Sequence, residues 1–231
     1  MEEKDLSELK KARIFNNITG DEIESLMDCV RGQIRSFPKD DIVFSAGEKI
    51  DSIGVLMEGQ LQVESVDYWG NTAIISLIDP GEIVGEAYAS ADAEPIPNDV
   101  IALSDCRILF MNMHSILTEC QRACSFHNQL IQNLYTIATR RNRYMNRKIS
   151  HMSKRTTREK LLSYLSDIAQ QKNSSHFTIP FDRQQLADYL CIDRAAMSTE
   201  ISKLQKEGFI KTNRNHFELI ACNETDLQAD K

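Results

Sequence analysis

The chain has 231 residues, of which 42% are apolar and 26% charged, the composition of a globular protein with one large or two small domains. No apolar run approaches the roughly 18–20 residues that cross a bilayer, and the charged N-terminus lacks a signal-peptide stretch. We therefore expect a cytoplasmic protein with no membrane partner.

The net charge of −7 is unevenly distributed along the chain. Residues 1–136 hold 10 Lys and Arg against 23 Asp and Glu, whereas residues 137–216 hold 16 against 7. A basic segment of this size is typical of a nucleic-acid-binding protein, so the two halves are expected to have different partners.

The first half changes from a helical to a β pattern. Residues 5–31 carry apolar side chains at helical spacing, with a break at Thr19-Gly20-Asp21. Residues 34–111 contain short apolar or alternating runs separated by glycines, such as GQLQVESV. Many short strands of this kind predict an antiparallel β-roll, and we assign residues 1–112 to this N-terminal sensor domain.

Residues 113–150 are predicted to form a long dimerisation helix. No glycine or proline occurs from Met113 to Ile149, and Leu130, Leu134 and Ile137 follow one helical stripe. A helix of this length exceeds what a compact domain needs, and the simplest partner is a second copy in a coiled-coil-like homodimer. The alternative is a helix that lies across its own β-roll, and the two arrangements can hold on different faces.

Residues 151–231 follow the order of a winged helix-turn-helix. A helix in TTREKLLSYLSDI, capped by Thr156 or Thr157 with Glu159, precedes a short strand in FTIPF. Two helices in RQQLADYLCIDRAAMSTEISKL and a β-hairpin in GFIKTNRNHFELI come next. The predicted fold class is therefore α+β, with a β-roll, a long helix and a DNA-binding domain.

The second helix of this unit carries the residues expected to read DNA. Asp193 stands at its cap position, and the first turns of such a helix contact base edges in the major groove. Arg194 can pair with a guanine or a phosphate, while Ser198 and Thr199 can hydrogen-bond to various partners. The predicted DNA-binding residues are Arg183, Gln184, Arg194, Ala195, Ser198, Thr199, Lys203, Lys211 and Arg214.

From about Phe15 to Ile220 the chain resembles the Crp/Fnr family of bacterial transcription regulators. FPKDDIVFSAGEKIDSIGVLMEGQLQV and DPGEIVGE resemble its cyclic-nucleotide-binding roll, and KRTTREKLLSYL and FDRQQLADYLCIDRAAMSTEISKLQKEGFI its DNA-binding domain. The resemblance implies a homodimer in which a small effector in the roll reorients the DNA-binding domains through the long helix. It also implies promoter DNA and RNA polymerase as partners. We expect no enzymatic activity, because no nucleophile–base set or phosphate-cradling loop is visible.

The effector is expected to differ from cyclic AMP. Members that bind cyclic AMP follow the Gly-Glu pair with an Arg-Ser pair that holds the phosphate. Gly85-Glu86 is present here, but Ile96-Pro97-Asn98 stands where the Arg-Ser pair is expected, and a buried phosphate without arginine is poorly compensated. The expected effector-pocket residues are Gly85, Glu86, Ala87, Asn98, Arg141 and Asn142.

The six cysteines offer one alternative chemistry. Oxygen-sensing members carry a cysteine cluster near the N-terminus, but residues 1–28 contain none, so we expect no iron–sulfur cluster. Cys120, Cys124 and His127 share one helix face and leave open a redox- or haem-sensing module, or simple packing on the roll. We assign no metal site to them. A cupin-like enzyme lacks ligands, because all five histidines follow the roll.

Two further positions depart from the family. Cys191 stands at a turn where members usually have glycine, and a left-handed non-glycine residue costs roughly 1 kcal/mol. Ala195 and Thr199 stand where several members have glutamate and arginine. The family's DNA half-site is therefore not transferable. A regulatory subunit that acts on another protein is also possible from the roll, but it needs no DRAAMSTEISKL helix.

Overall fold

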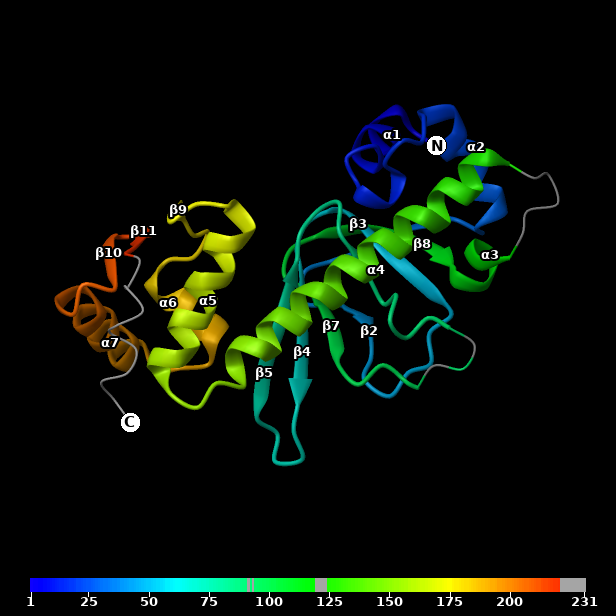
Figure 1. Ribbon diagram of the computed structural model, residues 1–231. Helices are drawn as coiled ribbons and strands as arrows, with labels where there is room; N and C mark the ends of the chain where they lie inside the picture. Colours follow the sequence, from blue (N-terminus) through cyan, green and yellow to red (C-terminus); the bar gives the residue numbers. More distant parts are fainter. Residues whose placement is uncertain (91, 93, 119–123, 221–231) are drawn as a thin grey trace. The chain divides into compact units, whose positions relative to one another are not determined.

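The computed structural model describes residues 1–90, 92, 94–118 and 124–220. Two compact units divide the chain at residues 140 and 141, and Figure 1 shows helix α4 (Ser125–Met152) continuing from one to the other. The domain boundaries at residues 112 and 150 stay a prediction, since α4 contributes to both units.

The first unit begins with three short helical segments, as the interrupted apolar pattern predicts. They are α1 (Glu3–Leu9), the 3-10 turn η1 (Arg13–Phe15) and α2 (Gly20–Cys29). The predicted break at Thr19 is the N-cap of α2, where the Thr19 backbone N–H donates to Glu22 Oε2 at 2.8 Å. This reciprocal capping satisfies backbone groups that would otherwise lack partners at the helix start.

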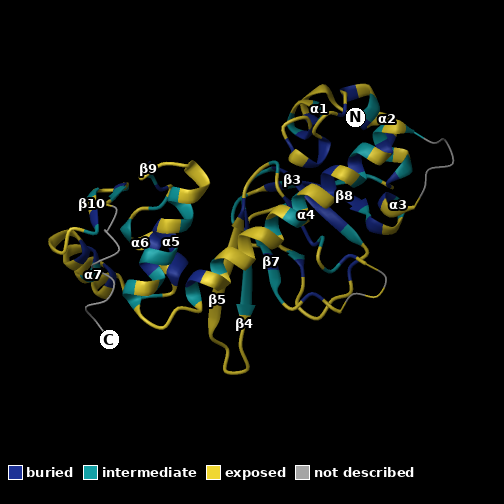
Figure 2. Ribbon diagram, viewed as in Figure 1, coloured by how far each residue is buried: buried dark blue, intermediate teal, exposed yellow. Residues whose placement is uncertain are grey.

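Two four-stranded antiparallel sheets form the predicted β-roll. One has the order β1 (Gln33–Phe37), β8 (Cys106–Asn112), β3 (Ser52–Glu58) and β6 (Ile83–Val84). The other has the order β2 (Ile42–Phe44), β7 (Asp99–Ala102), β4 (Leu61–Val66) and β5 (Thr72–Ile78). Figure 2 shows buried residues along β3 and β8, where Gly54 lies opposite Phe110. The roll is confirmed.

The long helix is confirmed in its second part, but its expected start at Met113 is wrong. Met113–Leu117 forms a separate helix, α3, and α4 begins only at Ser125. Asn112 caps α3, and the Thr118 backbone is extended while its hydroxyl donates to the His114 carbonyl at 2.7 Å. This side-chain bond ends the first helix without a glycine or proline, so the sequence contained no breaker to recognise.

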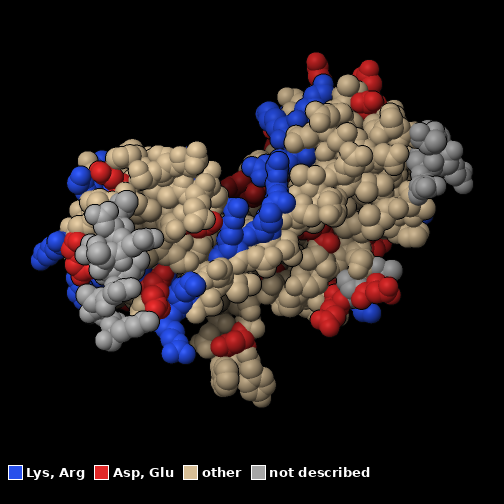
Figure 3. All heavy atoms as spheres, viewed as in Figure 1, with Lys and Arg blue, Asp and Glu red and all other residues tan. Residues whose placement is uncertain are grey.

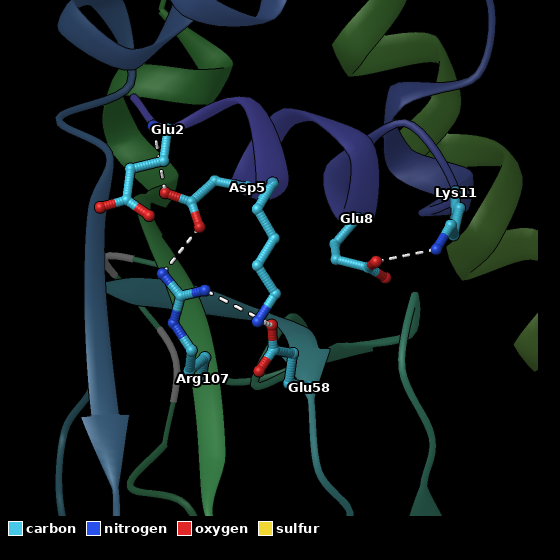
Figure 4. A network of polar contacts seen from close by, with 7 residues as sticks. Glu2, Asp5, Glu8, Lys11, Glu58 and Arg107 are labelled. Atoms are coloured by element: carbon cyan, nitrogen blue, oxygen red, sulfur yellow. Dashed lines mark hydrogen bonds and ion pairs between the residues drawn. The ribbon is translucent and has the colours of Figure 1, made fainter.

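A polar network attaches α1 to the roll, as Figure 4 shows. Asp5 is 4% exposed, and its Oδ1 accepts from Arg107 Nη2 at 2.7 Å. Arg107 Nη1 lies 3.4 Å from Glu58 Oε1, which also pairs with Lys4 Nζ at 2.7 Å. The hydrogen bond from Lys4 and the nearby cations hold the pKa of Glu58 below its usual value. The guanidinium of Arg107 thereby compensates the buried carboxylate of Asp5, a contact that the sequence pattern did not predict.

The second unit has the predicted order of helices and strands. Its elements after α4 are α5 (Thr157–Lys172), β9 (His176–Thr178), α6 (Arg183–Leu190), α7 (Arg194–Lys206), β10 (Ile210–Asn213) and β11 (His216–Leu219). The strands form an antiparallel sheet in the order β10-β11-β9. Leu161, Leu186, Leu190, Met197 and Leu204 are buried in one core beneath α5, α6 and α7. Ala187 is also fully buried in this core.

Candidate nucleic-acid interface

A tight turn at Cys191 joins α6 to α7. Cys191 adopts φ +49° and ψ +57°, and its N–H donates to the Asp188 carbonyl at 3.2 Å. The Ile192 N–H donates to the Ala187 carbonyl at 3.0 Å, which completes a Schellman motif with cysteine in the position that glycine favours. The predicted left-handed backbone is therefore present. The thiol is exposed and lies 3.6 Å from the Asp188 carbonyl.

Asp193 caps the start of α7. Its Oδ1 accepts from the Ala196 N–H at 2.7 Å, the N-cap bond expected from the sequence. Arg194, Ala195, Ser198 and Thr199 are exposed, whereas Met197 and Ile201 on the opposite side are buried. The first turns of α7 thus have one face fixed to the core and one face toward solvent.

Arg183 has a more enclosed position than the other predicted contacts. Its Nη2 donates to Thr212 Oγ1 at 3.1 Å, and its guanidinium lies 5.1 Å from the Phe217 ring centroid. Burial lowers the pKa of this side chain. Its Nη1 is buried and has no hydrogen-bond partner among the described residues.

A hollow of about 610 Å³ brings three of the predicted cations together. Arg183, Arg194 and Arg214 line it with Gln184 and Asn215. Arg214 is exposed at the turn between β10 and β11 and has φ +53°. Three guanidinium groups around one hollow suit an oxyanion, because each presents several N–H donors.

Two predicted lysines already have acidic neighbours. Lys211 Nζ lies 3.3 Å from Glu218 Oε1, and Lys203 Nζ lies 3.8 Å from Glu200 Oε2. Both lysine side chains are largely exposed, so these pairs are weak and exchangeable. Gln184 Nε2 donates to Asp188 Oδ1 along α6 at 2.8 Å.

Arg158 was not predicted, although it fixes α7 against α5. Its guanidinium contacts Glu200 at 3.2 Å, pairs with Glu207 and lies 5.0 Å from the Phe209 ring centroid. The hydrogen bond from Arg158 holds the pKa of Glu207 below its usual value. No local sequence pattern predicts these contacts, because Glu200 and Glu207 lie more than 40 positions from Arg158 in the sequence.

An aromatic cluster beneath α6 was also missed. Tyr164, Phe181 and Tyr189 pack with centroid separations of 5.0 to 6.1 Å, and His151 packs edge-on against Tyr164. Burial raises the pKa of Tyr189 to about 12 and raises that of Tyr164 still further. His151 Nδ1 lies 2.9 Å from Ser163 Oγ. Tyr164 and Tyr189 belong to the core of the second unit, and Phe181 packs against that core.

The expected effector residues fall in both units. Gly85 is buried with φ +87°, Glu86 and Asn98 are half-buried and Ala87 is exposed, all in the first unit. Arg141 and Asn142 belong to the second unit, where Asn142 Oδ1 accepts from Asn146 at 2.8 Å. The pocket stays a prediction.

The alternative cysteine–histidine chemistry has limited support. Cys120 lies outside the described residues, as does Cys222, and Cys124 is half-buried. His127 is 3% exposed, and its Nε2 lies 2.8 Å from the Ile116 carbonyl. Among the residues that the structure describes, no three potential metal ligands cluster.

Two family models match this chain and together span most of it. The cyclic nucleotide-binding domain matches residues 34–123, and the Crp-like helix-turn-helix domain matches residues 159–229. The first is the roll and the second is the unit that carries α6 and α7. The chain belongs to the Crp/Fnr family of transcription regulators.

Individual Crp/Fnr relatives are distant. The transcriptional activator protein FnrA of Stutzerimonas stutzeri is 21% identical over 205 residues, covering 86% of this chain and 81% of the relative. A solved structure of CprK in complex with OCPA is 17% identical with a TM-score of 0.56, covering 85% of this chain and 91% of that one. The catabolite activator protein of Thermus thermophilus is 17% identical with a TM-score of 0.50, covering 94% and 96%. At this identity the structural likeness concerns the fold.

As a Crp/Fnr-type transcription regulator, the chain combines a cyclic-nucleotide-binding-type roll with a DNA-binding unit. Family regulators with this helix-turn-helix bind promoter DNA and typically dimerise. No described helix is long and apolar enough to span a membrane.

Proposed function

We propose that this regulator reads promoter DNA with the N-terminal end of α7, under control of a small effector of the β-roll. The observation that carries the proposal is the exposed face of Arg194, Ala195, Ser198 and Thr199 on a helix that Asp193 caps. The major groove admits an α-helix, and side chains on its first turns reach base edges.

The three arginines of the hollow have different proposed roles. Arg183 is held by Thr212, packs on Phe217 and lines the hollow, and it is proposed to contact a phosphate of the DNA backbone. Arg214 lies at the hairpin turn and is proposed to contact the backbone as well. Such contacts fix the register of the protein on DNA without reading its sequence. Arg194 begins α7 and is the proposed base reader.

The same proposal includes a homodimer formed through α4. A seven-residue repeat runs along α4 from Tyr135 to Met152, and Tyr135 and Ile149 in it are 70% and 61% exposed. In a coiled coil with this repeat, the a positions are Tyr135, Asn142 and Ile149, and the d positions are Ala138, Met145 and Met152. A single asparagine at an a position specifies register and strand number, and Asn142 has that position here.

Control of DNA binding is proposed to come from an effector other than cyclic AMP. Gly85, Glu86, Ala87, Asn98, Arg141 and Asn142 remain the proposed pocket. RNA polymerase is the proposed protein partner at the promoter. We propose that the protein acts on promoter DNA in the cytoplasm and that it is not an enzyme.

Replacement of Arg194 by alanine tests the base-reading role. Genomic fragments selected with the purified protein supply the DNA, and footprinting should lose the protected site while dimer mass stays unchanged. The binding free energy should weaken by about 1–3 kcal/mol for each half-site, which is the contribution of one bidentate contact to a base. Arg194→Lys is the matched control, because it retains the charge and should retain non-specific binding but not the footprint. An unchanged footprint in both variants excludes Arg194 as a reader.

A further inference from the structure

The first unit has a second hollow, separate from the DNA-binding unit. Its volume is about 370 Å³, near the lower end of the roughly 300–1,000 Å³ of small-molecule pockets. Its lining comes from the turn after α2, strands β1, β2 and β8, and the segment that leads into β3 together with the first residue of that strand. A hollow of this size suits a small metabolite rather than a peptide or a nucleic acid.

Three cations surround this hollow in an otherwise acidic unit. Arg31, Arg35 and Lys49 line it, and no described acid forms an ion pair with any of them. Arg107 of the same unit, by contrast, pairs with Asp5 and Glu58. A concentration of unpaired positive charge within a negative domain favours an anionic ligand.

Arg31 is held in a strained backbone conformation. Its φ is +53°, in the left-handed region, although it has a full side chain and the next residue is glycine. The Gly32 N–H donates to the Met27 carbonyl at 2.8 Å and closes the end of α2 around Arg31. This is the same helix-ending arrangement as at Cys191, and glycine would adopt the conformation more easily.

The rest of the lining offers hydrogen bonds and a small apolar floor. Glu48, Asp51, Gln33 and Asn112 present acceptors or donors to the hollow. Asp51 is oriented by Ser52 Oγ at 2.7 Å and by Asn112 Nδ2 at 3.1 Å. Carboxylates beside cations do not favour a bare anion, but they accept hydrogen bonds from hydroxyl groups.

Phe44 and Phe110 form the apolar floor. Their rings meet edge to face with centroids 5.7 Å apart, and the Arg35 guanidinium lies 5.0 Å from the Phe110 centroid. A Cβ built on Gly85 would lie 3.2 Å from Phe44 and 2.9 Å from Ile50, so Gly85 backs this floor directly. A ligand in the hollow would therefore touch side chains that pack on the Gly85 turn.

We propose that this hollow binds a small phosphorylated polyol, such as a sugar phosphate. The phosphate lies among Arg31, Arg35 and Lys49, and the hydroxyl groups hydrogen-bond to the acids and amides. The carbon skeleton packs on the Phe110 side of the floor. This site is additional to the proposed effector residues, and its binding needs no DNA.

Arg31→Gly is the decisive variant, because it removes a cation and relieves backbone strain together. Calorimetry on the full chain uses ribose 5-phosphate, glucose 6-phosphate and 3-phosphoglycerate, with ribose and inorganic phosphate as controls. We expect saturable binding of at least one phosphorylated compound, tighter than either control. Arg31→Gly should weaken it by about ten-fold or more, the effect of losing one charge-assisted hydrogen bond. Its melting temperature should equal or exceed that of the native protein.

Asp40→Gly is the matched control. Asp40 also has a positive φ, +71°, in the same unit but lies outside the hollow, so the variant should melt at an equal or higher temperature and bind normally. Arg35→Gln should repeat the loss seen with Arg31→Gly. No saturable binding of the three compounds, equal binding of inorganic phosphate, or undiminished binding by Arg31→Gly overturns the proposal. None of these outcomes bears on DNA recognition, which the assay does not involve.

Discussion

Cys191 ends α6 in a left-handed conformation that glycine adopts at lower cost. The helix pattern predicted a turn at this residue, and the resemblance to the Crp/Fnr family, whose members usually have glycine there, indicated the left-handed conformation. Its side chain is exposed, so the residue contributes no packing that would offset the strain. Cys191 is therefore a residue where a substitution should stabilise the protein.

Cys191→Gly is expected to stabilise the second unit by about 0.5–1 kcal/mol, because relief of the left-handed strain exceeds the entropic cost of glycine. Thermal unfolding followed by circular dichroism measures the change. Cys191→Ser retains a Cβ at the same φ and should leave the stability near the native value. Equal stability of the glycine and serine variants would show that the turn is not strained.

The predicted DNA-reading residues differ in how far the sequence described them. Asp193 was predicted as the cap of α7, and Arg194, Ser198 and Thr199 as residues that face DNA. The structure has these three residues exposed, while Met197 and Ile201 are buried on the other side of the helix. Arg183 was predicted as one contact among several. Its packing on Phe217 and its bond to Thr212 depend on a hairpin about 30 residues later, which local patterns do not encode.

At the scale of elements, the sequence predicted the capping motifs of the helices but not the contacts between elements. The Thr156 hydroxyl oxygen accepts from the Glu159 N–H at 3.1 Å, and the Glu159 carboxylate accepts from the Thr156 N–H. This is the predicted reciprocal cap of α5. The attachment of α1 to the roll joins Asp5 to Arg107, 102 positions apart. Such pairs are set by strand order, which the sequence pattern left open.

Arg107→Ala should loosen α1 from the roll. Loss of the guanidinium leaves the Asp5 carboxylate buried without its charged partner, which costs roughly 1–3 kcal/mol. Amide hydrogen exchange in Glu3–Leu9 should accelerate while exchange in α2 stays slow.

Lys4→Ala is the comparison for that variant. The Lys4 side chain is 65% exposed and forms an ion pair with Glu58 at the surface, so its removal should have a much smaller effect. Equal acceleration in both variants would indicate that helix propensity, not the buried pair, holds α1 in its position.

At the scale of the whole molecule, charge segregation corresponds to the two units. The segment 1–136, in which acidic residues outnumber basic ones, lies in the first unit. The basic segment 137–216 lies mostly in the second unit. Figure 3 shows Lys and Arg side chains gathered over α4, whose second half contains Arg143, Arg147 and Lys148. Cations that contact DNA phosphates make the affinity depend on salt, so we expect the DNA affinity of this protein to fall as the salt concentration rises.

The native protein should have twice its chain mass of 26.3 kDa in light scattering. Ile149→Glu should yield monomers, because it introduces a charge into the proposed α4 seam. Ser150→Glu adds the same charge at an exposed neighbouring position outside the seam and should remain dimeric. A native monomer at micromolar concentration, or a dimeric Ile149→Glu variant, would contradict assembly through this face.

The sequence by itself determined the family, the order of the elements and the outward face of α7. Periodicity, caps and turn residues are local features, so each can be recognised from a few neighbouring positions in the sequence. Only the tertiary structure decided what long-range packing controls: the break between α3 and α4, the Asp5–Arg107 contact and the grouping of Arg31, Arg35 and Lys49 around one hollow. Those features depend on which distant segments meet, and strand pairing and core packing set these meetings rather than any local pattern.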